Sequence, residues 1–584
     1  MSNHTPKHPT RAHDVACSAT LALALSLTTA ASIATVGFRE MSVFSNPDTR
    51  MIYLIALSVG LFIGVGIVCY ALLRNMTRII RWSDSKQPLT ILSLTFDKRS
   101  VLIASAIILV FWIPWIILQY PCSMNGDTYN QLYQFQTSYP TYYSTIGITV
   151  DESFIDHHPV FDTLLFGAFL TFGDAIGSQN VGLFAYSLFQ CILTAGMLGL
   201  CCCYLERLQV PKLFRVISLA FCAFFIPIPM WATCMIKDAL YSVMFALFCL
   251  VFAEAVRTRG GSLESKRMVV AYILIACLCI LTKKTGALIV AIATIVLFIF
   301  ARKRWRELLL GFATPLVICF ILIPVALYPA IGGVASGGKQ EMFGFAFQQV
   351  ITAINEDDDL SSQELESVSK VLDIERAQKK YQVNIVDPVK NSARKDATTS
   401  DYLNFIPAYF TIGARHIPAY TSSIFNVVGT LVTPGRTFTY FNTPEQTDEW
   451  KSQFIKADTK GELHLTFNKP EPIASASDAF NTLWRKGIPK LGPFQIPFNV
   501  GFYGGWIPMI CIVICLFKNR KWAISLVPII IAFGIIVIGP ASSVRYALPM
   551  LYTTPLMLGI LCAALRPSDK LPRAEDACAI IDSN

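Results

Sequence analysis

The most constraining feature of this chain is a series of apolar runs that are long enough to cross a membrane. A helix needs roughly 20 predominantly apolar residues to cross about 30 Å of hydrocarbon, and such runs recur from one end of the sequence to the other. Only 15% of the 584 residues are charged, against about 25% in soluble proteins. We therefore predict an all-α polytopic protein of the cell (plasma) membrane. About twelve spans are expected, near 16–36, 51–73, 101–119, 181–204, 213–230, 236–256, 268–282, 286–301, 307–329, 502–517, 522–540 and 548–565.

Lys and Arg are concentrated in alternate loops, and this pattern predicts which loops face the cytoplasm. If the N-terminus is cytoplasmic, twelve spans put every basic loop on the cytoplasmic side, as the positive-inside rule requires. The run 160–176 would be a thirteenth span, but a crossing there would move the following loops to the wrong side. We therefore expect 160–176 to be an interfacial or re-entrant element on the outer face, and the C-terminus to be cytoplasmic. The basic segments are 74–87, 206–215, 256–267, 302–307, 518–521 and 566–573.

The positions of the cysteines indicate whether disulfides are expected, and the first apolar run raises the question of a cleaved signal peptide. Most of the 17 cysteines lie in apolar runs and none lies between residues 330 and 499, so a disulfide framework of the secreted kind is not expected. Lys7 and Arg11 precede the first apolar run, as in a signal peptide. Because a second span follows closely, we interpret this run as an uncleaved first span. The net charge of +9 reflects basic cytoplasmic loops and does not indicate nucleic-acid binding.

The alternation of apolar runs with polar segments divides the chain into five parts. The segment 330–499 is the longest polar part, and we expect it to form a small irregular extracytoplasmic domain that covers the membrane core. The parts are residues 1–100, with two spans and a basic cytoplasmic loop; 101–329, a membrane core with an acidic outer loop at 120–180; 330–499; 500–565, the C-terminal membrane helices; and 566–584, a cytoplasmic tail.

The predicted outer loop 120–180 is acidic and aromatic and contains no Lys or Arg. It carries Asp127 in "MNGDTYNQ", and Asp156, His157 and His158 in "IDHHP". These side chains are candidates for a substrate site. Two structural alternatives stay open: "IDHHP" starts a helix at its proline, and Asp127 is a helix N-cap. A divalent metal at the histidines is a further alternative, although adjacent side chains rarely bind one ion together and no further spaced His or Cys accompanies them.

Cationic residues lie at the predicted outer ends of four spans. Ionisable residues near a bilayer are costly to keep, and each is a functional candidate by default. Each cation also has a simpler interpretation, in which it snorkels to lipid phosphates. Together, and opposite an acidic loop, the cations predict a site for the phosphate of a substrate. The cations are Lys237 in "MIKDALYS", Lys283 and Lys284 in "LTKKTGAL", and Arg545 in "GPASSVRYALPM". Asp238 and Tyr546, which directly follow Lys237 and Arg545, are candidates for the same substrate site.

In this order, the motifs resemble those of the GT-C superfamily of membrane glycosyltransferases, which includes protein O-mannosyltransferases and lipid A aminoarabinose transferases. "HHPVFDTLLFG" looks like the superfamily's "HPP-hydrophobic-FG" segment, and "VRYALP" looks like its late "RY-x-x-P" element. The chain is also similar to an uncharacterised family of bacterial polytopic membrane proteins with GT-C features, through "KDALY", "TKKTG", "FGFAFQQV" and "VDPVK". The resemblance covers roughly residues 100–565. The chain departs from the superfamily in its two extra N-terminal spans, in "HHP" for "HPP", and in lacking a large C-terminal soluble domain.

The resemblance implies a transferase that uses a polyprenyl-phosphate-linked sugar donor and modifies an extracytoplasmic glycan, lipid or protein acceptor. Asp127 matches the superfamily's catalytic base. His157 and His158 match positions beside the donor or acceptor head group, and Arg545 matches a residue near the donor phosphate. The residue types allow the same chemistry, because a carboxylate can take the proton of an attacking hydroxyl while cations stabilise a leaving phosphate. One base opposite one leaving group predicts inversion at the sugar carbon. Membrane lipids are the other expected partners.

Two other functions are compatible with a polytopic membrane protein of this composition. A transporter or flippase of lipid-linked saccharides also has about twelve spans, but it is expected to carry ionisable residues and broken helices near mid-membrane, often in repeated halves. Here the charges lie at span ends and no internal repeat is visible. A polysaccharide polymerase or ligase also acts on lipid-linked glycans, and the sequence does not separate it from single-sugar transfer.

Overall fold

The computed structural model describes residues 11–37, 47–85, 92, 94–137, 154–334, 339–357, 359–438 and 465–566. Most of these residues lie in helices, and each of the four strands has two residues. Within these ranges seven helices are long and apolar enough to cross a membrane, which supports the prediction of an all-α polytopic membrane protein. The predicted tail 566–584 lies outside the described residues after Arg566. The seven helical segments are Arg11–Thr35, Ile52–Met76, Lys98–Leu118, Gln179–Tyr204, Lys237–Arg257, Arg302–Ala330 and Val544–Leu565.

The other predicted spans correspond to shorter apolar helices. The predicted span 213–230 is divided at Pro227 into α9 (Lys212–Phe224) and α10 (Pro227–Ala232), because proline lacks the amide hydrogen that would continue the helix. The run 160–176 forms α7 (Val160–Ala175), whose 16 residues are fewer than a full crossing requires. The remaining short helices are α12 (Lys266–Thr282), α13 (Gly286–Phe300), α24 (Ile507–Lys518), α25 (Arg520–Ser525) and α26 (Val527–Val537).

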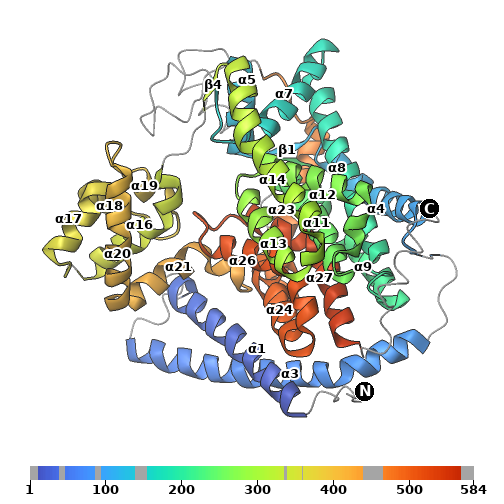
Figure 1. Ribbon diagram of the computed structural model, residues 1–584, viewed down its shortest axis with the longest axis horizontal. Coiled ribbons are helices and arrows are strands. Elements are labelled where there is room, and N and C mark those ends of the chain that lie inside the picture. Colours follow the sequence, from blue (N-terminus) through green and yellow to red (C-terminus); the bar gives the residue numbers. More distant parts are fainter. Residues whose placement is uncertain are drawn as a thin grey trace.

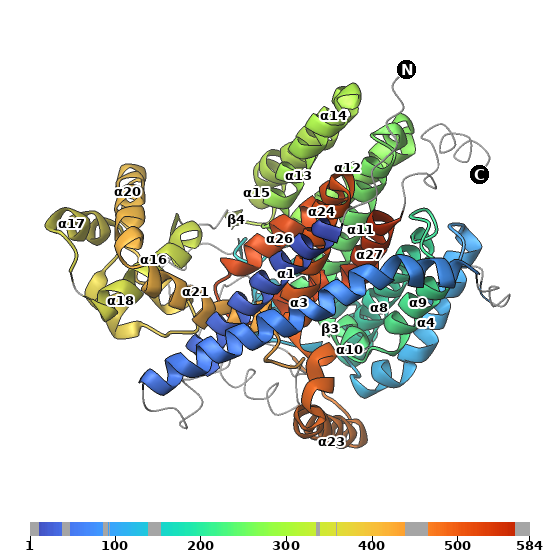
Figure 2. The same ribbon diagram turned by 90° about the horizontal axis from the view of Figure 1, so that it is seen from below.

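Two helices lie at the centre of the bundle. In α11 (Lys237–Arg257) and α27 (Leu548–Leu565), 94% of the apolar window is buried, whereas none of it is buried in α3 (Pro47–Ser85). Figures 1 and 2 show α3 beside α1 (Arg11–Ser32) at the edge of the bundle. The apolar surface of α3 is therefore left uncovered by the rest of the described chain, which is typical of a helix that contacts lipid. The other bundle elements are α4 (Lys98–Leu118), α8 (Gln179–Tyr204), α14 (Trp305–Val317) with the π-helix η4 (Ile318–Leu327), and the π-helix η6 (Phe502–Trp506).

Residues 339–415 form a small helical unit beside the bundle, which we call the side unit (Figure 1). It has an apolar core of its own, centred on Phe347 and Phe405. This corrects the expectation of an irregular domain for these residues. Ser361 and Glu364 form a capping box at the start of one of its helices. The helices of the side unit are α16 (Lys339–Glu356), α17 (Ser362–Val371), α18 (Ile374–Lys380), α19 (Asp387–Lys390) and α20 (Thr399–Arg415).

The rest of the segment 330–499 belongs with the bundle. α21 (Ile417–Val432) leaves the side unit and packs on α1 and η6. α23 (Glu471–Gly487) packs on α4, where the rings of Phe480 and Trp115 lie 5.1 Å apart. It continues into the 3₁₀ segment η5 (Ile488–Phe498).

Two pairs of very short parallel strands join distant parts of the chain. β1 (Ser123–Met124) pairs with β3 (Cys234–Met235), and β2 (Phe154–Ile155) pairs with β4 (Gly333–Val334). Each pair brings a segment of the predicted acidic loop against a helix end from elsewhere in the sequence. β1 leads into α5 (Gly126–Thr137), and β4 follows the single turn α15 (Tyr328–Ala330).

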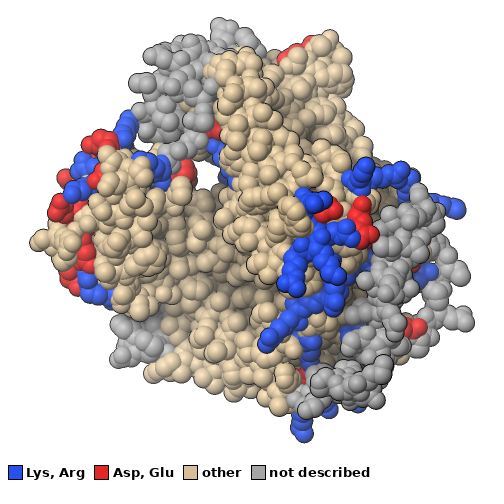
Figure 3. All heavy atoms as spheres, in the orientation of Figure 1, with Lys and Arg blue, Asp and Glu red and all other residues tan. Residues whose placement is uncertain are grey.

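Basic side chains are gathered over one part of the face shown in Figure 3, whereas the side unit carries acidic and basic side chains together. The basic loops 256–267 and 302–307 lie next to each other, because Arg304 of one pairs with Glu264 of the other. We call this the basic end of the bundle. The opposite end is the one at which α11 and α27 begin.

Candidate functional site

The candidate site is built where the first turns of α5 and α11 meet. The β1–β3 pair sets Met124 opposite Met235, and the Thr128 hydroxyl donates a hydrogen bond to the Met235 carbonyl. Each strand is followed within two residues by its helix. Asp127 of α5 and Lys237 of α11 therefore lie side by side, although 110 positions separate them in the sequence.

Asp127 is held between two cations. One of its carboxylate oxygens, Oδ2, lies 2.7 Å from Nη1 of Arg545 and 3.3 Å from Nζ of Lys237. Burial by itself raises the pKa of Asp127, but Arg545, Lys237 and then His158 outweigh it and hold that pKa well below its usual range. In this arrangement Asp127 is an ionised carboxylate, and the interpretation of Asp127 as a simple N-cap does not describe its contacts.

Arg545 bridges two carboxylates. Its Nε lies 3.5 Å from Oδ2 of Asp238, which is 0% exposed, and the other oxygen of Asp238 accepts a hydrogen bond of 2.6 Å from Lys283. The Lys283 ammonium also lies 4.9 Å from the ring centre of Tyr546 and 5.3 Å from that of Tyr241. Two carboxylates, two cations and two aromatic rings thus form one continuous layer at the starts of α11 and α27.

His158 joins this layer through Lys237. Nζ of Lys237 lies 2.8 Å from Nδ1 of His158, and because an ammonium can only donate, that imidazole nitrogen is the acceptor. Burial, and next the charge of Lys237, lower the pKa of His158 well below its ordinary value. The ring of His157 lies 4.8 Å from that of His158, and burial with the same lysine charge lowers its pKa to about 4. Both rings are therefore neutral near pH 7.

Asp156 and Lys284 form the outer edge of the site. Nζ of Lys284, which is 48% exposed, lies 3.0 Å from Oδ1 of Asp156. The hydroxyl of Tyr328 donates a 2.9 Å hydrogen bond to the other oxygen of Asp156. Tyr328 belongs to α15, and the β2–β4 pair fixes α15 beside the "IDHHP" segment. Sequence reasoning missed Tyr328 because nothing in "LYPA" distinguishes it from an ordinary apolar span end.

The structure brings all ten sequence-predicted residues into one cluster. They are linked through Asp127 to Arg545, Asp238, Lys283 and Tyr546 on one side. The other side runs through Lys237 to His158 and His157, and through the neighbouring Asp156 to Lys284. None of the ten is isolated from the others. The cluster is Asp127, Asp156, His157, His158, Lys237, Asp238, Lys283, Lys284, Arg545 and Tyr546.

Asp162 is a buried acid next to this cluster. It is 0% exposed, and neither carboxylate oxygen has a hydrogen-bond partner among the residues the structure describes. Burial raises the pKa of Asp162 well above its usual range. Its surroundings therefore favour the neutral form of this carboxyl group. The cues for it were its place in an apolar helix and its spacing of four from His158.

The side unit reaches the site at two points. The amide of Val386 donates a 2.8 Å hydrogen bond to the carbonyl of Pro540, five residues before Arg545. Lys390, which is 5% exposed, lies 3.0 Å from Glu341 and contributes with it to the electrostatic environment of His157. The side unit therefore borders the cluster.

A metal centre finds no support in the geometry. In the part of the chain that the structure describes, no group of three or more His, Cys, Asp or Glu side chains is arranged to hold a metal ion. The acids of the cluster contact Lys and Arg instead. Four cations lie in this cluster, beside the first turns of α5 and α11, and such an arrangement suits an anion chemically.

The whole chain was compared with known proteins. No curated protein and no solved structure matches it. A family profile described as a family of unknown function, DUF6020, matches residues 10–570. That range covers nearly the entire chain, from the first helix to the end of α27, and includes every residue of the cluster. The chain belongs to DUF6020.

Proposed function

We propose that this protein is a membrane glycosyltransferase that moves a sugar from a polyprenyl-phosphate-linked donor to an acceptor hydroxyl on the extracytoplasmic face. The observation that carries the proposal is the contact of one carboxylate, Asp127, with two cations, Arg545 and Lys237, at membrane-helix ends. A base next to cations is what a transfer between a hydroxyl and a phosphate-linked sugar requires.

The proposed reaction uses these residues in one displacement. The acceptor hydroxyl attacks the anomeric carbon of the sugar and gives its proton to Asp127. The bond between that carbon and the phosphate oxygen breaks, and its electron pair leaves with the lipid phosphate. Arg545 and Lys237 stabilise the charge that develops on the phosphate. Attack opposite the leaving group inverts the sugar carbon.

The charges of the cluster match this reaction. Counted with their formal charges, the four cations exceed the three acids by one, so the site itself carries one net positive charge. A lipid-phosphate-sugar donor is a phosphodiester with one negative charge. After transfer Asp127 is protonated and the site carries two positive charges, while the released lipid phosphate approaches two negative charges. The cations are Lys237, Lys283, Lys284 and Arg545, and the acids are Asp127, Asp156 and Asp238.

The low pKa of Asp127 is compatible with its role as the base, because binding of the donor would raise that pKa. Arg545 and Lys237 lower the pKa of Asp127 and so make it a weak base. A donor phosphate that binds these two cations draws part of their charge away from Asp127, which raises its pKa. The base becomes effective when the donor is bound.

The proposal is tested in the native host by gene deletion and complementation. Cells receive the wild-type gene, Asp127→Asn, or the control Asp84→Asn, which removes a carboxylate that pairs with Arg566 at the other end of the protein. Polyprenyl-phosphate sugars and surface glycans are then measured by mass spectrometry, with protein levels checked in membranes.

We expect the deletion and Asp127→Asn strains to accumulate one lipid-linked sugar and to lose one envelope sugar, while Asp84→Asn behaves as wild type. Unchanged lipids and glycans in the deletion strain would refute glycosyl transfer. Loss of a surface glycan without any accumulated lipid-linked monosaccharide would favour a flippase or a polymerase.

A further inference from the structure

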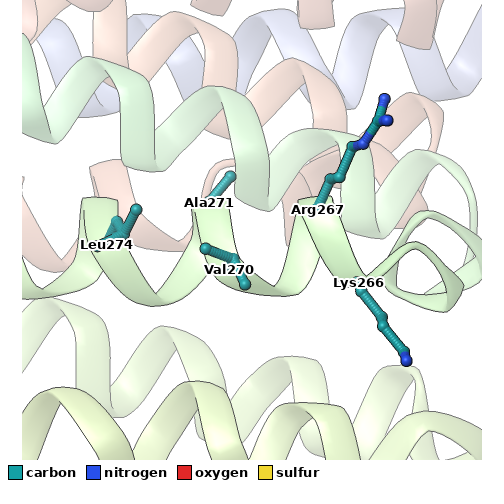
Figure 4. A pocket seen from close by; sticks show the side chains of 5 residues that line it. All are labelled: Lys266, Arg267, Val270, Ala271 and Leu274. Carbon is teal, nitrogen blue, oxygen red and sulfur yellow. The ribbon is translucent and has the colours of Figure 1, made fainter.

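A groove runs along one face of α12 at the basic end of the bundle, far from the site described above. The groove is open on its outer side, has a volume of about 420 Å³ and is lined by five residues of that helix. Figure 4 shows these side chains along the helix, with the two basic residues at one end. They are Lys266, Arg267, Val270, Ala271 and Leu274.

The surface that lines the groove is apolar, and two cationic side chains stand at one end of it. Lys266 and Arg267 stand in the first turn of α12 and are exposed. Val270 and Leu274, one and two turns further along, are 54% and 57% exposed. Positive charge at one end and bare apolar surface along the rest match a molecule that has an anionic head and a hydrocarbon tail.

The two cations are not neutralised within the protein. No ion pair or hydrogen bond involves the Lys266 or Arg267 side chain among the described residues. Cations at the start of a helix are also opposed by the helix dipole, which favours negative charge there. An external anion would offset both effects.

The surroundings of the groove strengthen the attraction for anions. The segments 254–267 and 302–307 contain eight Lys and Arg residues against three Glu residues, and the Arg304–Glu264 pair holds the two segments together. α12 continues from this basic end into the apolar bundle, where it packs on α11 and α14. A ligand head would therefore lie at the membrane surface and its tail in the hydrocarbon.

We propose that this groove binds an anionic glycerophospholipid of the leaflet at the basic end of the bundle. The phosphate contacts Lys266 and Arg267, and an acyl chain lies over Val270 and Leu274. The proposal is independent of the function of the Asp127 cluster. It makes α12, which leads into Lys283 and Lys284, a helix with a lipid at one end and the candidate site at the other.

The test measures lipid retention by the full chain. Detergent-purified protein is incubated with phosphatidylglycerol or with phosphatidylcholine, and bound lipids are counted by native mass spectrometry. The variant Lys266→Gln/Arg267→Gln removes the head contacts. The control Arg302→Gln/Lys303→Gln removes two cations of the same basic end that do not line the groove.

We expect the wild-type chain to retain phosphatidylglycerol in preference to phosphatidylcholine. The groove variant should bind phosphatidylglycerol at least tenfold more weakly, and the control variant less than threefold more weakly. Equal retention of the two lipids by the wild-type chain, or equal losses in the two variants, would show only diffuse attraction to a basic surface and would overturn the proposal.

Two further measurements keep the proposal testable if the double variant folds poorly. Ala271→Trp fills the groove and leaves both cations in place, so it should also lose phosphatidylglycerol; unchanged retention would remove the lipid from this groove. Soluble glycerol phosphate should not displace the bound lipid, because it lacks the acyl chain. Displacement by glycerol phosphate would assign the cations to a free phosphate and contradict a lipid site.

Discussion

The contact between Asp238 and Lys283 gives a quantitative prediction for the architecture of the site. Asp238 is fully buried, and its Oδ1 lies 2.6 Å from Nζ of Lys283. Removing one partner of a buried ion pair costs about 3–5 kcal/mol, because the other charge is left unpaired. Lys283 keeps some contact with water and with the Tyr241 and Tyr546 rings. We therefore expect Asp238→Asn to lower the free energy of unfolding by the lower figure, about 3 kcal/mol.

A double-mutant cycle separates this pair from other effects of the substitutions. Lys283→Met should cost a similar amount, since it leaves the buried Asp238 with the more distant Arg545 alone. The double variant leaves no unpaired charge and should be less destabilised than the sum of its parts, with a coupling of about 2 kcal/mol. The exposed pair of Glu366 and Lys370 serves as the control and should give a much smaller coupling, because solvent screens it.

The assay is unfolding by SDS in mixed micelles, followed by tryptophan fluorescence. A coupling between Asp238 and Lys283 no larger than that of the exposed control pair would mean that the two side chains do not form a buried contact. The layer that holds Arg545 would then be wrongly described, and the charge balance proposed for the site would fail with it.

Three further predictions concern other parts of the molecule. The pKa of His157 falls from 6.5 to about 4 in the folded protein, so the unfolded chain binds more protons and stability is lost as the pH falls from about 6.5 toward 4. His157→Asn should reduce the difference between unfolding midpoints measured near pH 7 and pH 4.5, and an unchanged difference would contradict a buried neutral imidazole. Ser361→Ala removes the N-cap of α17 and should weaken amide-exchange protection of that helix by about 1 kcal/mol, whereas equal protection would argue against the cap. Gly501→Ala adds a methyl group that meets the Thr433 carbonyl, so it should lower the yield of folded protein. Gly435→Ala is the control, because a methyl group there has open space and should leave the yield unchanged. Equal yields of the two variants on size-exclusion chromatography would disprove the close approach of Gly501 to Thr433.

The residue types of the site could be predicted from the sequence because they are charged or polar residues next to apolar runs. Lys237, Lys283 and Arg545 interrupt apolar runs, where a charge is costly unless it has a partner. The paired histidines and Asp127 stand out in the same way within an aromatic loop. Such cues identify residue types and the ends of helices at which they lie. They do not identify partners, so Arg545 as a bridge between Asp127 and Asp238 appears only in the structure.

The short strand pairs that bring the site residues together could not be predicted from the sequence. β1 to β4 have two residues each, which is too short for the alternation that marks a strand. Their pairing is nonetheless what sets α5 beside α11 and Tyr328 beside Asp156. The burial of Asp162 without a partner depends on the packing of α7 against α5 and α8, which a one-dimensional pattern does not contain.

The outer part of the chain was predicted less well than the membrane part. Membrane spans follow from length and apolarity alone, but the side unit folds around a core of its own that is made of scattered apolar positions such as Phe347 and Phe405. Local capping by Ser361, together with tertiary packing on α20, forms helix α17 of this unit.

The central claim is that the Asp127 cluster transfers a sugar from a lipid phosphate, and it is tested most directly on purified protein. The lipid-linked sugar fraction extracted from a deletion strain is incubated with the reconstituted chain and an acceptor extract, and release of polyprenyl phosphate is measured by mass spectrometry. We expect release by the wild-type protein and a rate about 10²–10⁴-fold lower with Asp127→Asn, the range for loss of a general base. No release by the wild-type chain, or equal release by Asp127→Asn, would contradict the account.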